Sequence, residues 1–228
     1  AVRKAAQEMG ILLGQATAAV VGATGAIGKV CAKKLAEDVA EIYLIGRRMD
    51  ALQALMRQIQ PTAPNTQIHI STDVNMIKEA HIILTVTSST DTIIYPEHLQ
   101  PGSVICDVAR PRDVSAQVAA VRDDVFVIDG GMVDVPGPVD FHFDFGFPPG
   151  KAYACMAETM ALALEGRFED YTLGKNITRE QVDEIDHISK KHGFRVSGFR
   201  SFEKAVTEEQ IGRVRERAQK HSIQDLRS

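Results

Sequence analysis

The sequence has few cysteines, no excess of basic residues and no long hydrophobic run. Its three cysteines, Cys31, Cys106 and Cys155, are an odd number without regular spacing, which excludes a disulfide framework. No apolar run reaches transmembrane length, and the first residues lack the pattern of a signal peptide. We therefore expect a cytoplasmic protein without a membrane span.

The charge balance narrows the class of partner. The chain has 26 Lys and Arg against 30 Asp and Glu, a net charge of −4, which argues against general nucleic-acid or membrane-surface binding. Apolar residues make up 44% of 228, enough for the core of one large α/β domain, alone or with a helical appendage. Because the sequence starts at Ala1 within a helical pattern, without Met, we expect a further N-terminal region of the same protein.

A glycine-rich turn joins a strand pattern to a helix pattern near the start of the chain. The apolar run at residues 17–22 leads into GATGAIG at 22–28, and a helix pattern follows to residue 36. In a dinucleotide-binding βαβ unit, such glycines allow a tight turn, close approach to a pyrophosphate and close packing of helix on strand, while the helix N-terminus faces the phosphates. The predicted cofactor-binding residues here are Gly22, Thr24, Gly25, Ala26, Ile27 and Gly28.

The end of the second strand pattern indicates which dinucleotide binds. An acidic residue that would hold a free ribose 2′-hydroxyl is expected there, but the sequence has Gly46 followed by Arg47 and Arg48. Cations at this position suit a 2′-phosphate, so we predict NADPH as the cofactor. The alternative is an ordinary turn with surface arginines.

Strand and helix patterns alternate over the first 130 residues. Near-continuous apolar runs, such as residues 82–87, are typical of strands buried on both faces. This alternation predicts an α/β fold with a doubly wound parallel sheet of Rossmann type and a C-terminal helical extension. The strands are expected at residues 17–22, 41–46, 67–70, 82–87, 104–108 and 125–128.

The pattern changes beyond Gly130 and Gly131. Residues 132–150 contain four prolines and little periodicity, and loops this long are usually functional or disordered. We predict an NADP-binding domain over residues 1–150 and a helical region over residues 151–228 that packs on it. Three helices are expected: residues 151–165; residues 177–191, with a capping box of Thr178 and Gln181; and residues 207–221, a charged helix that is solvated or packed on a missing partner.

Three loops follow strands at the edge where ligands bind in a doubly wound sheet. The first provides Thr87 and Ser88 for the nicotinamide end, although a polar turn explains these residues equally well. The last provides Gly130 and Gly131. Between them, Arg110 and Arg112 offer cations for a substrate anion or are solvated surface residues. We predict Thr87, Ser88, Gly130 and Gly131 as cofactor contacts.

Cys155 is the strongest candidate for a catalytic nucleophile. It lies early in a predicted helix, where the helix N-terminus favours a thiolate, and Lys151, one turn earlier, would add to the effect. An ionised Glu158 nearby would oppose it. The alternative is that Cys155 is a small core residue, which is how we interpret Cys31 and Cys106.

His142 is a weaker candidate, because it alternates with phenylalanines in the irregular segment. It could donate a proton near the site together with Asp144, or it could be a hydrogen-bonded structural histidine. The remaining histidines show no ligand spacing, so we predict no metal.

Several motifs closely resemble those of the cyanobacterial-type long-chain acyl-[acyl-carrier-protein] reductases. They are the glycine turn, DGGMV at 129–133, YACMAE at 153–158, GKNIT at 174–178 and HGF at 192–194, within a likeness that runs from about residue 1 to 196. In that family the cysteine of the ACxAE-type motif takes the acyl group as a thioester, and hydride from NADPH releases the aldehyde. The resemblance implies this role for Cys155, with an acyl carrier protein or acyl-CoA as the partner.

A second run, DVARPRDV at 107–114, is similar to the NADPH domain of glutamyl-tRNA reductase and supports the cofactor more than the substrate. The leading hypothesis is an NADPH-dependent reductase of a fatty acyl thioester. The alternatives are an NADP-dependent dehydrogenase of a small ketone or amino-acid-like substrate, and a non-catalytic NADPH-binding module.

Overall fold

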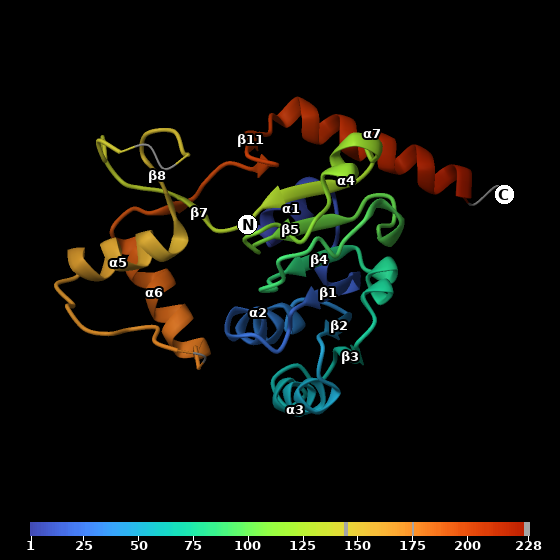
Figure 1. Cartoon of the computed structure of the whole chain (residues 1–228), viewed down its shortest axis with the longest axis horizontal. Coiled ribbons are helices and arrows are strands. Elements are labelled where there is room, and N and C mark those ends of the chain that lie inside the picture. Colours follow the sequence, from blue (N-terminus) through green and yellow to red (C-terminus); the bar gives the residue numbers. More distant parts are fainter. Residues whose placement is uncertain (144–145, 175, 226–228) are drawn as a thin grey trace. The chain divides into compact units, whose positions relative to one another are not determined.

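The computed structural model describes residues 1–143, 146–174 and 176–225 (Figure 1). The chain forms two compact units. The sheet unit comprises residues 2–130 and 199–228, and the cysteine unit comprises residues 131–198 together with Ala1. The division therefore falls after Gly130 and Gly198, whereas the sequence analysis placed a single boundary after residue 150.

The sheet unit is built on six parallel strands in the order β3-β2-β1-β4-β5-β6. The order reverses between β1 and β4, where Val20 pairs with Leu44 on one side and Leu84 on the other. This is the arrangement of a doubly wound Rossmann sheet, so the predicted fold is confirmed. The strands are β1 (Thr17–Val21), β2 (Glu41–Ile45), β3 (Gln67–Ser71), β4 (Ile82–Thr85), β5 (Val104–Asp107) and β6 (Phe126–Asp129).

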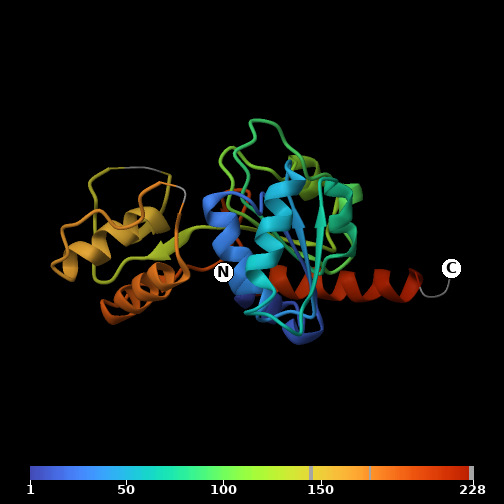
Figure 2. The same ribbon diagram turned by 90° about the horizontal axis from the view of Figure 1, so that it is seen from below.

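Helices cover both faces of this sheet (Figure 2). One face packs against α1 (Val2–Glu8), α2 (Ala26–Ala36) and α3 (Met49–Ile59), which bury Ala6, Leu35 and Leu55. The opposite face packs against η2 (Val74–Glu79), the segment after η3 (Pro96–His98), and α4 (Ala116–Val121), which bury Ile77, Leu99 and Val118. A short helical turn, η1 (Leu13–Gln15), leads into β1.

The C-terminal tail belongs to the sheet unit. After the hairpin of β10 (Arg200–Ser201) and β11 (Lys204–Ala205), helix α7 (Glu208–Asp225) runs along this unit, in red in Figure 2. It buries Ile211 and Ala218, each only 6% exposed, in the same core as α1 to α3. Most of the described residues of α7 are exposed, as expected of a solvated helix, but its apolar residues Ile211 and Ala218 pack on the core of the sheet unit itself.

The cysteine unit combines a small antiparallel sheet with two helices. The sheet has the order β8-β7-β9, with β7 (Met132–Asp134), β8 (Lys151–Tyr153) and β9 (Arg195–Val196). Helices α5 (Ala154–Leu164) and α6 (Arg179–Lys191) enclose a separate core with Ala161, Ile188 and Phe194. The helix predicted from residue 151 therefore begins at Ala154, because residues 151–153 pair with β7.

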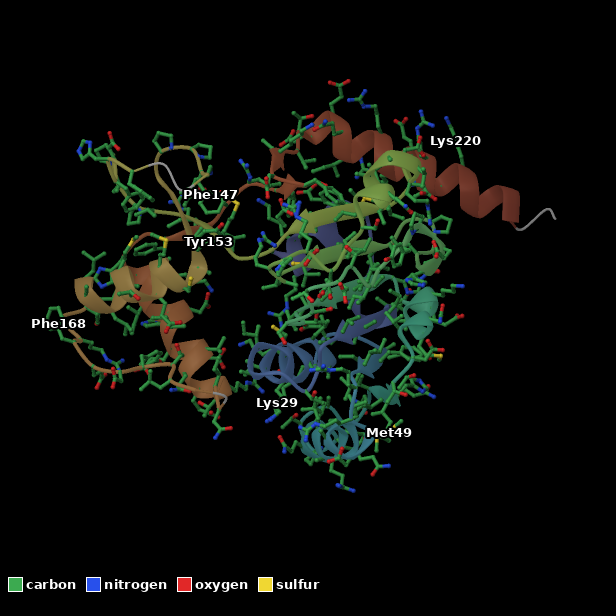
Figure 3. The ribbon with its side chains drawn as sticks, in the orientation of Figure 1. Lys29, Met49, Phe147, Tyr153, Phe168 and Lys220 are labelled. Carbon is green, nitrogen blue, oxygen red and sulfur yellow. The ribbon has the colours of Figure 1, made fainter. Side chains whose placement is uncertain are left out.

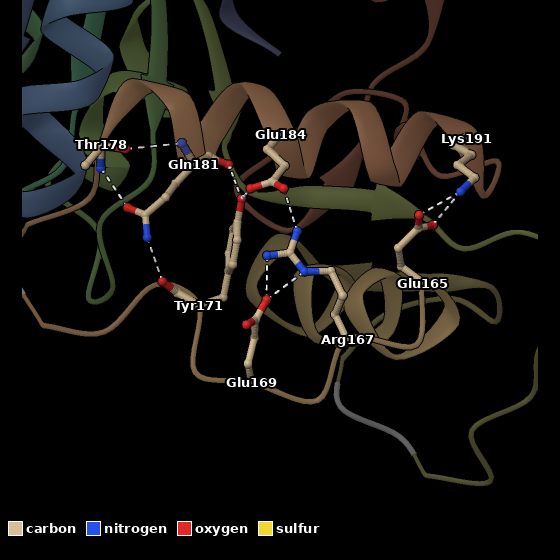
Figure 4. A network of polar contacts seen from close by, with 8 residues as sticks. All are labelled: Glu165, Arg167, Glu169, Tyr171, Thr178, Gln181, Glu184 and Lys191. Carbon is tan, nitrogen blue, oxygen red and sulfur yellow. Dashed lines mark hydrogen bonds and ion pairs between the residues drawn. The ribbon is translucent and has the colours of Figure 1, made fainter.

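Polar contacts fasten the segment between α5 and α6 onto α6 (Figure 4). Arg167 bridges Glu169 and Glu184, and the Tyr171 hydroxyl donates to the Gln181 carbonyl oxygen at 3.0 Å. Burial, followed by the hydrogen bond to Glu184, raises the pKa of Tyr171 to about 12. This segment is ordered by its own side chains, although Lys175 of the GKNIT motif lies outside the described residues.

The predicted capping box at the start of α6 is confirmed. The Gln181 backbone N–H donates to Thr178 Oγ1 at 3.2 Å, and Gln181 Oε1 accepts the Thr178 backbone N–H at 2.9 Å. None of the helices in the described part of the chain is both long and apolar enough to cross a membrane.

Candidate functional site

The glycine turn lies at the switch point of the sheet. Gly22 has a φ of +81°, and a Cβ there would lie 2.9 Å from the carbonyl oxygen of Val86, which directly follows the neighbouring strand β4. The backbone N–H groups of Gly22 and Ala23 both donate to the Ile45 carbonyl oxygen, at 2.9 and 3.0 Å. The turn is therefore fixed to β2 and β4 and can be formed only with glycine at position 22.

Helix α2 begins directly at this turn. Gly25 is its N-cap and supplies no side-chain cap, so the N–H groups of Ala26, Ile27 and Gly28 have no partner within the helix. Such a terminus binds phosphate through its free N–H groups and the positive end of the helix dipole. The turn and the helix start therefore fit the pyrophosphate of a dinucleotide.

The end of β2 presents two free cations. Arg47 and Arg48 are both exposed, and neither guanidinium has a hydrogen-bond or ion-pair partner in the described part of the chain. Gly46 carries no carboxylate that would compete with an anion. This corner fits a ribose 2′-phosphate better than a free 2′-hydroxyl.

A buried carboxylate organises the loop after β4, and the sequence analysis did not identify it. Asp113 is fully buried and accepts hydrogen bonds from the hydroxyls of Thr85 and Thr87. The Thr87 hydroxyl also accepts the Ser89 backbone N–H at 3.1 Å. The Thr87 hydroxyl is thus already hydrogen-bonded within the loop, to Asp113 and Ser89. The Ser88 side chain, in contrast, is exposed and free to contact a ligand.

A second buried carboxylate, Asp107, holds the loop after β5. Its oxygens accept the backbone N–H groups of Ala109 and Val114, each at 3.0 Å. Burial raises the pKa of Asp107 to about 6, and the nearby Asp113 also raises it. The signal for both acids was present in the DVARPRDV run at 107–114, but the sequence does not show that they are buried.

Arg112 lies in the same loop after β5, and the charge of its guanidinium is already paired with carboxylates. Its Nη2 lies 3.3 Å from Asp129 and 3.3 Å from Glu203, and its guanidinium stacks over Phe202. Of the two alternatives for Arg112, binding of a substrate anion is therefore not supported, and its side chain is only 20% exposed. Gly130, at the end of β6, packs so closely on Val108 that a Cβ would lie 2.6 Å from its Cγ2.

Cys155 lies in the first turn of α5. Tyr153 is the N-cap and supplies no side-chain cap, while the Ala154 N–H donates to the Gly131 carbonyl oxygen at 2.7 Å. The backbone N–H groups of Cys155 and Met156 are therefore the donors left free at this helix start. The ring of Tyr153 packs edge-on against Phe147, with ring centroids 4.5 Å apart (Figure 3).

Exposure separates the three cysteines. Cys155 is exposed, Cys31 is half-buried in α2 and Cys106 is buried in β5. Burial raises the pKa of Cys31 to about 11 and that of Cys106 to about 12, which disfavours the reactive thiolate at both positions. Cys155 is the cysteine whose side chain is accessible at the surface.

Lys151 does not lie one helical turn before Cys155, as the sequence analysis expected. It is on strand β8, and its ammonium contacts the Asp134 carboxylate and donates to Ser197 Oγ at 2.6 Å. Ser197 Oγ in turn donates to Asp134 at 2.8 Å. Lys151 therefore links β8 to β7 and to the residue directly after β9, and its charge is already paired.

His142 lies on the surface, with its side chain 87% exposed and Nδ1 3.5 Å from Asp140. Asp144 lies outside the described residues. Glu158, expected to oppose a thiolate, accepts a hydrogen bond from the Thr172 hydroxyl.

Within residues 1–143, 146–174 and 176–225, no three His, Cys, Asp or Glu side chains form a group that could hold a metal ion.

Residues 3–130 match the family model described as shikimate / quinate 5-dehydrogenase. This range covers more than half of the 228 residues. The chain belongs to this family. The match lies within the sheet unit, so the chain carries an oxidoreductase-type NAD(P)-binding domain, and the prediction of a nicotinamide dinucleotide cofactor is confirmed.

Two curated relatives extend the likeness into the cysteine unit. The chain is 29% identical to Aminotransferase PigE of a Serratia species over 199 residues, which cover 86% of this chain and 23% of the relative. It is 31% identical to the long-chain acyl-[acyl-carrier-protein] reductase of Synechococcus elongatus over 206 residues, which cover 85% of this chain and 57% of the relative. The chain thus spans less than two thirds of either protein.

Among solved structures, the nucleotide-binding domain of glutamyl-tRNA reductase from Thermoplasma volcanium is similar, with 21% sequence identity and a TM-score of 0.37. The match covers 55% of this chain and 78% of that chain.

Proposed function

We propose that this protein is an NADPH-dependent reductase that converts a fatty acyl thioester, carried by an acyl carrier protein or coenzyme A, to an aldehyde. The observation that carries the proposal is the position of Cys155. It is the exposed cysteine of the three, and it lies at an uncapped helix start in a chain that has an NAD(P)-binding sheet unit. The likeness to the Synechococcus elongatus acyl reductase spans both units and supports the same substrate class.

The chemistry assigned to Cys155 begins with attack on the thioester carbonyl. The Cys155 thiolate forms a new carbon–sulfur bond as the bond to the carrier sulfur breaks, and the carrier sulfur takes up the proton that the Cys155 thiol released on ionisation. The helix dipole stabilises the thiolate, and the free N–H groups of Cys155 and Met156 can stabilise the oxyanion that forms during attack. Glu158, which lies three residues after Cys155, accepts a hydrogen bond from the Thr172 hydroxyl.

The sheet unit provides the second half of the reaction. NADPH, when bound there, supplies the hydride that reduces the Cys155 thioester. Release of the aldehyde restores the thiol at Cys155, so the cysteine is regenerated in each cycle. In the sheet unit, the glycine turn would hold the pyrophosphate, Arg47 and Arg48 the 2′-phosphate, and Ser88 the nicotinamide end.

Lys151 and His142 have smaller parts in this proposal than the sequence suggested. Lys151 is proposed as a positioning residue, because it fixes β8 directly before the helix that carries Cys155. A proton-donor role for His142 remains a prediction.

The family match favours a second candidate. Because residues 3–130 belong to the shikimate / quinate 5-dehydrogenase family, an NADP-dependent dehydrogenase of a small hydroxy or keto substrate is the alternative. Such an enzyme needs no covalent step, so Cys155 would be dispensable. A non-catalytic NADPH-binding module is the third possibility and predicts binding without turnover.

One comparison separates these functions. Aldehyde formation from long-chain acyl thioesters with NADPH is measured for the intact protein and for Cys155→Ala. We expect near-complete loss of aldehyde in the variant, with NADPH binding unchanged. A variant that retains full activity would contradict the covalent route, and oxidation of shikimate-like substrates by both proteins would favour the second candidate.

A further inference from the structure

The hydroxyl of Thr24 lies beside the end of strand β2. A Cβ at Gly46 would be 3.4 Å from Thr24 Oγ1 and 3.4 Å from Leu52 Cδ2. Thr24 belongs to the glycine turn, whereas Gly46 occupies the position from which this fold usually directs an acidic side chain at the ribose. A hydroxyl from the phosphate-binding turn therefore reaches the ribose corner of the site.

The Thr24 hydroxyl is also unoccupied. The residue is half-buried, and its side chain has no hydrogen-bond partner in the part of the chain that the structure describes. The two residues after Gly46, Arg47 and Arg48, are exposed and equally without partners. One corner of the sheet unit thus contains three free donors and a glycine in place of a carboxylate.

These donors differ in what they offer a ligand. Arg47 and Arg48 sit on long side chains and provide charge, whereas the short Thr24 side chain is fixed to the turn and provides one directional donor. A hydrogen bond to an ionised phosphate is roughly twice as strong as one to a neutral hydroxyl. Thr24 can therefore distinguish a 2′-phosphate from a 2′-hydroxyl.

We propose that Thr24 is a specificity-determining residue whose hydroxyl donates a hydrogen bond to the 2′-phosphate of NADPH. The glycine at position 46 leaves the phosphate room to approach this hydroxyl. The inference rests on the cofactor site of the proposed function and is independent of the reaction at Cys155.

The test compares Thr24→Val, which keeps the shape but removes the hydroxyl, with Thr24→Ser, which keeps the hydroxyl. Dissociation constants for NADPH and NADH are measured by isothermal titration calorimetry with the whole chain. We expect Thr24→Val to weaken NADPH binding about tenfold and NADH binding by less than about threefold, because the lost bond is to a charged group. Thr24→Ser should bind NADPH like the natural protein.

A second pair of ligands tests the contact with the 2′-phosphate without the nicotinamide half of the cofactor. Adenosine 2′,5′-bisphosphate and ADP differ in the 2′-phosphate, and the Thr24→Val substitution should weaken only the first. Equal losses for NADPH and NADH, or an unchanged affinity for NADPH, would overturn the assignment. So would a Thr24→Ser variant as weak as Thr24→Val, or natural protein that does not prefer NADPH.

These outcomes are distinct from failure of the proposed reaction. If the protein discriminates NADPH through Thr24 but forms no aldehyde and no acyl adduct, the cofactor inference stands and only the role of Cys155 fails. Retained NADH binding in Thr24→Val shows that the variant is folded.

Discussion

Gly28 and Gly22 are in such close contact that a side chain on Gly28 has no space: a Cβ there would lie 2.2 Å from the Gly22 carbonyl oxygen. The obstacle is backbone, so α2 itself would have to move away from the turn. This contact fixes the start of α2 relative to β1 and thereby the N–H groups that face the phosphates.

The Gly28→Ala variant should therefore lose both stability and cofactor binding. Overpacking of this kind costs about 1–3 kcal/mol, and displacement of α2 should weaken NADPH binding by an order of magnitude or more. Gly212→Ala is the matched control, because Gly212 lies in α7 with nothing within 4 Å of a new Cβ. It should raise the free energy of unfolding by about 0.5–1 kcal/mol. Urea unfolding and NADPH titration measure both effects, and a neutral Gly28→Ala would contradict the account.

The arginines after β2 should decide between the two nicotinamide dinucleotides. Replacing Arg47 and Arg48 together by Ala removes both free cations, so NADPH affinity should fall about tenfold or more while NADH affinity stays within about twofold. Arg57→Ala is the control, because Arg57 is also exposed but lies at the end of α3. Equal losses for both dinucleotides would show that the arginines serve the fold and not the 2′-phosphate.

Asp107 should give the sheet unit a distinctive pH dependence. Burial raises its pKa to about 6 from an ordinary value of about 3.9. Between these values the folded state binds more protons at Asp107 than the unfolded state, so its contribution to the free energy of unfolding falls as pH rises. The contribution is complete below about pH 4 and is lost above about pH 6.

Asp107→Asn removes this titration. The free energy of unfolding of the natural protein, relative to the variant, should fall by roughly 1–3 kcal/mol between pH 4 and pH 7. Parallel profiles for the natural protein and Asp107→Asn would mean that the carboxyl does not titrate in this range.

The capping box at Thr178 offers a test confined to the cysteine unit. Thr178→Ala removes the acceptor for the Gln181 N–H and should destabilise α6 by about 1 kcal/mol, whereas Thr178→Ser should preserve it. Hydrogen exchange at the amides of the first turn of α6 reports this directly. Unchanged exchange in Thr178→Ala would show that the cap contributes nothing.

Local signals in the sequence predicted much of this structure. The central strands of the parallel sheet were recognisable because buried parallel strands are nearly continuously apolar, as in Ile82–Thr85. The cap of α6 was recognisable because Thr178 and Gln181 are only three residues apart. Both features depend on neighbours in the chain.

The missed features depend on distant neighbours. The strands of the small sheet are two or three residues long, and Val133 pairs with Val196, so no period marks them. The position of Lys151 follows from that pairing and not from helical spacing. The tail was predicted as a charged helix, but the surface on which it packs could not be predicted, because Ile211 and Ala218 join a core built from residues far away in the chain.

The most direct test of the central claim is mass spectrometry of the intact protein after incubation with a long-chain acyl thioester in the absence of NADPH. We expect one added acyl group, mapped by peptide analysis to Cys155, absent from Cys155→Ala and discharged as aldehyde when NADPH is added. Cys31 and Cys106 serve as internal controls, because burial raises the pKa of both thiols. An unmodified protein, or acylation that persists in Cys155→Ala, would contradict the assignment of Cys155 as the nucleophile.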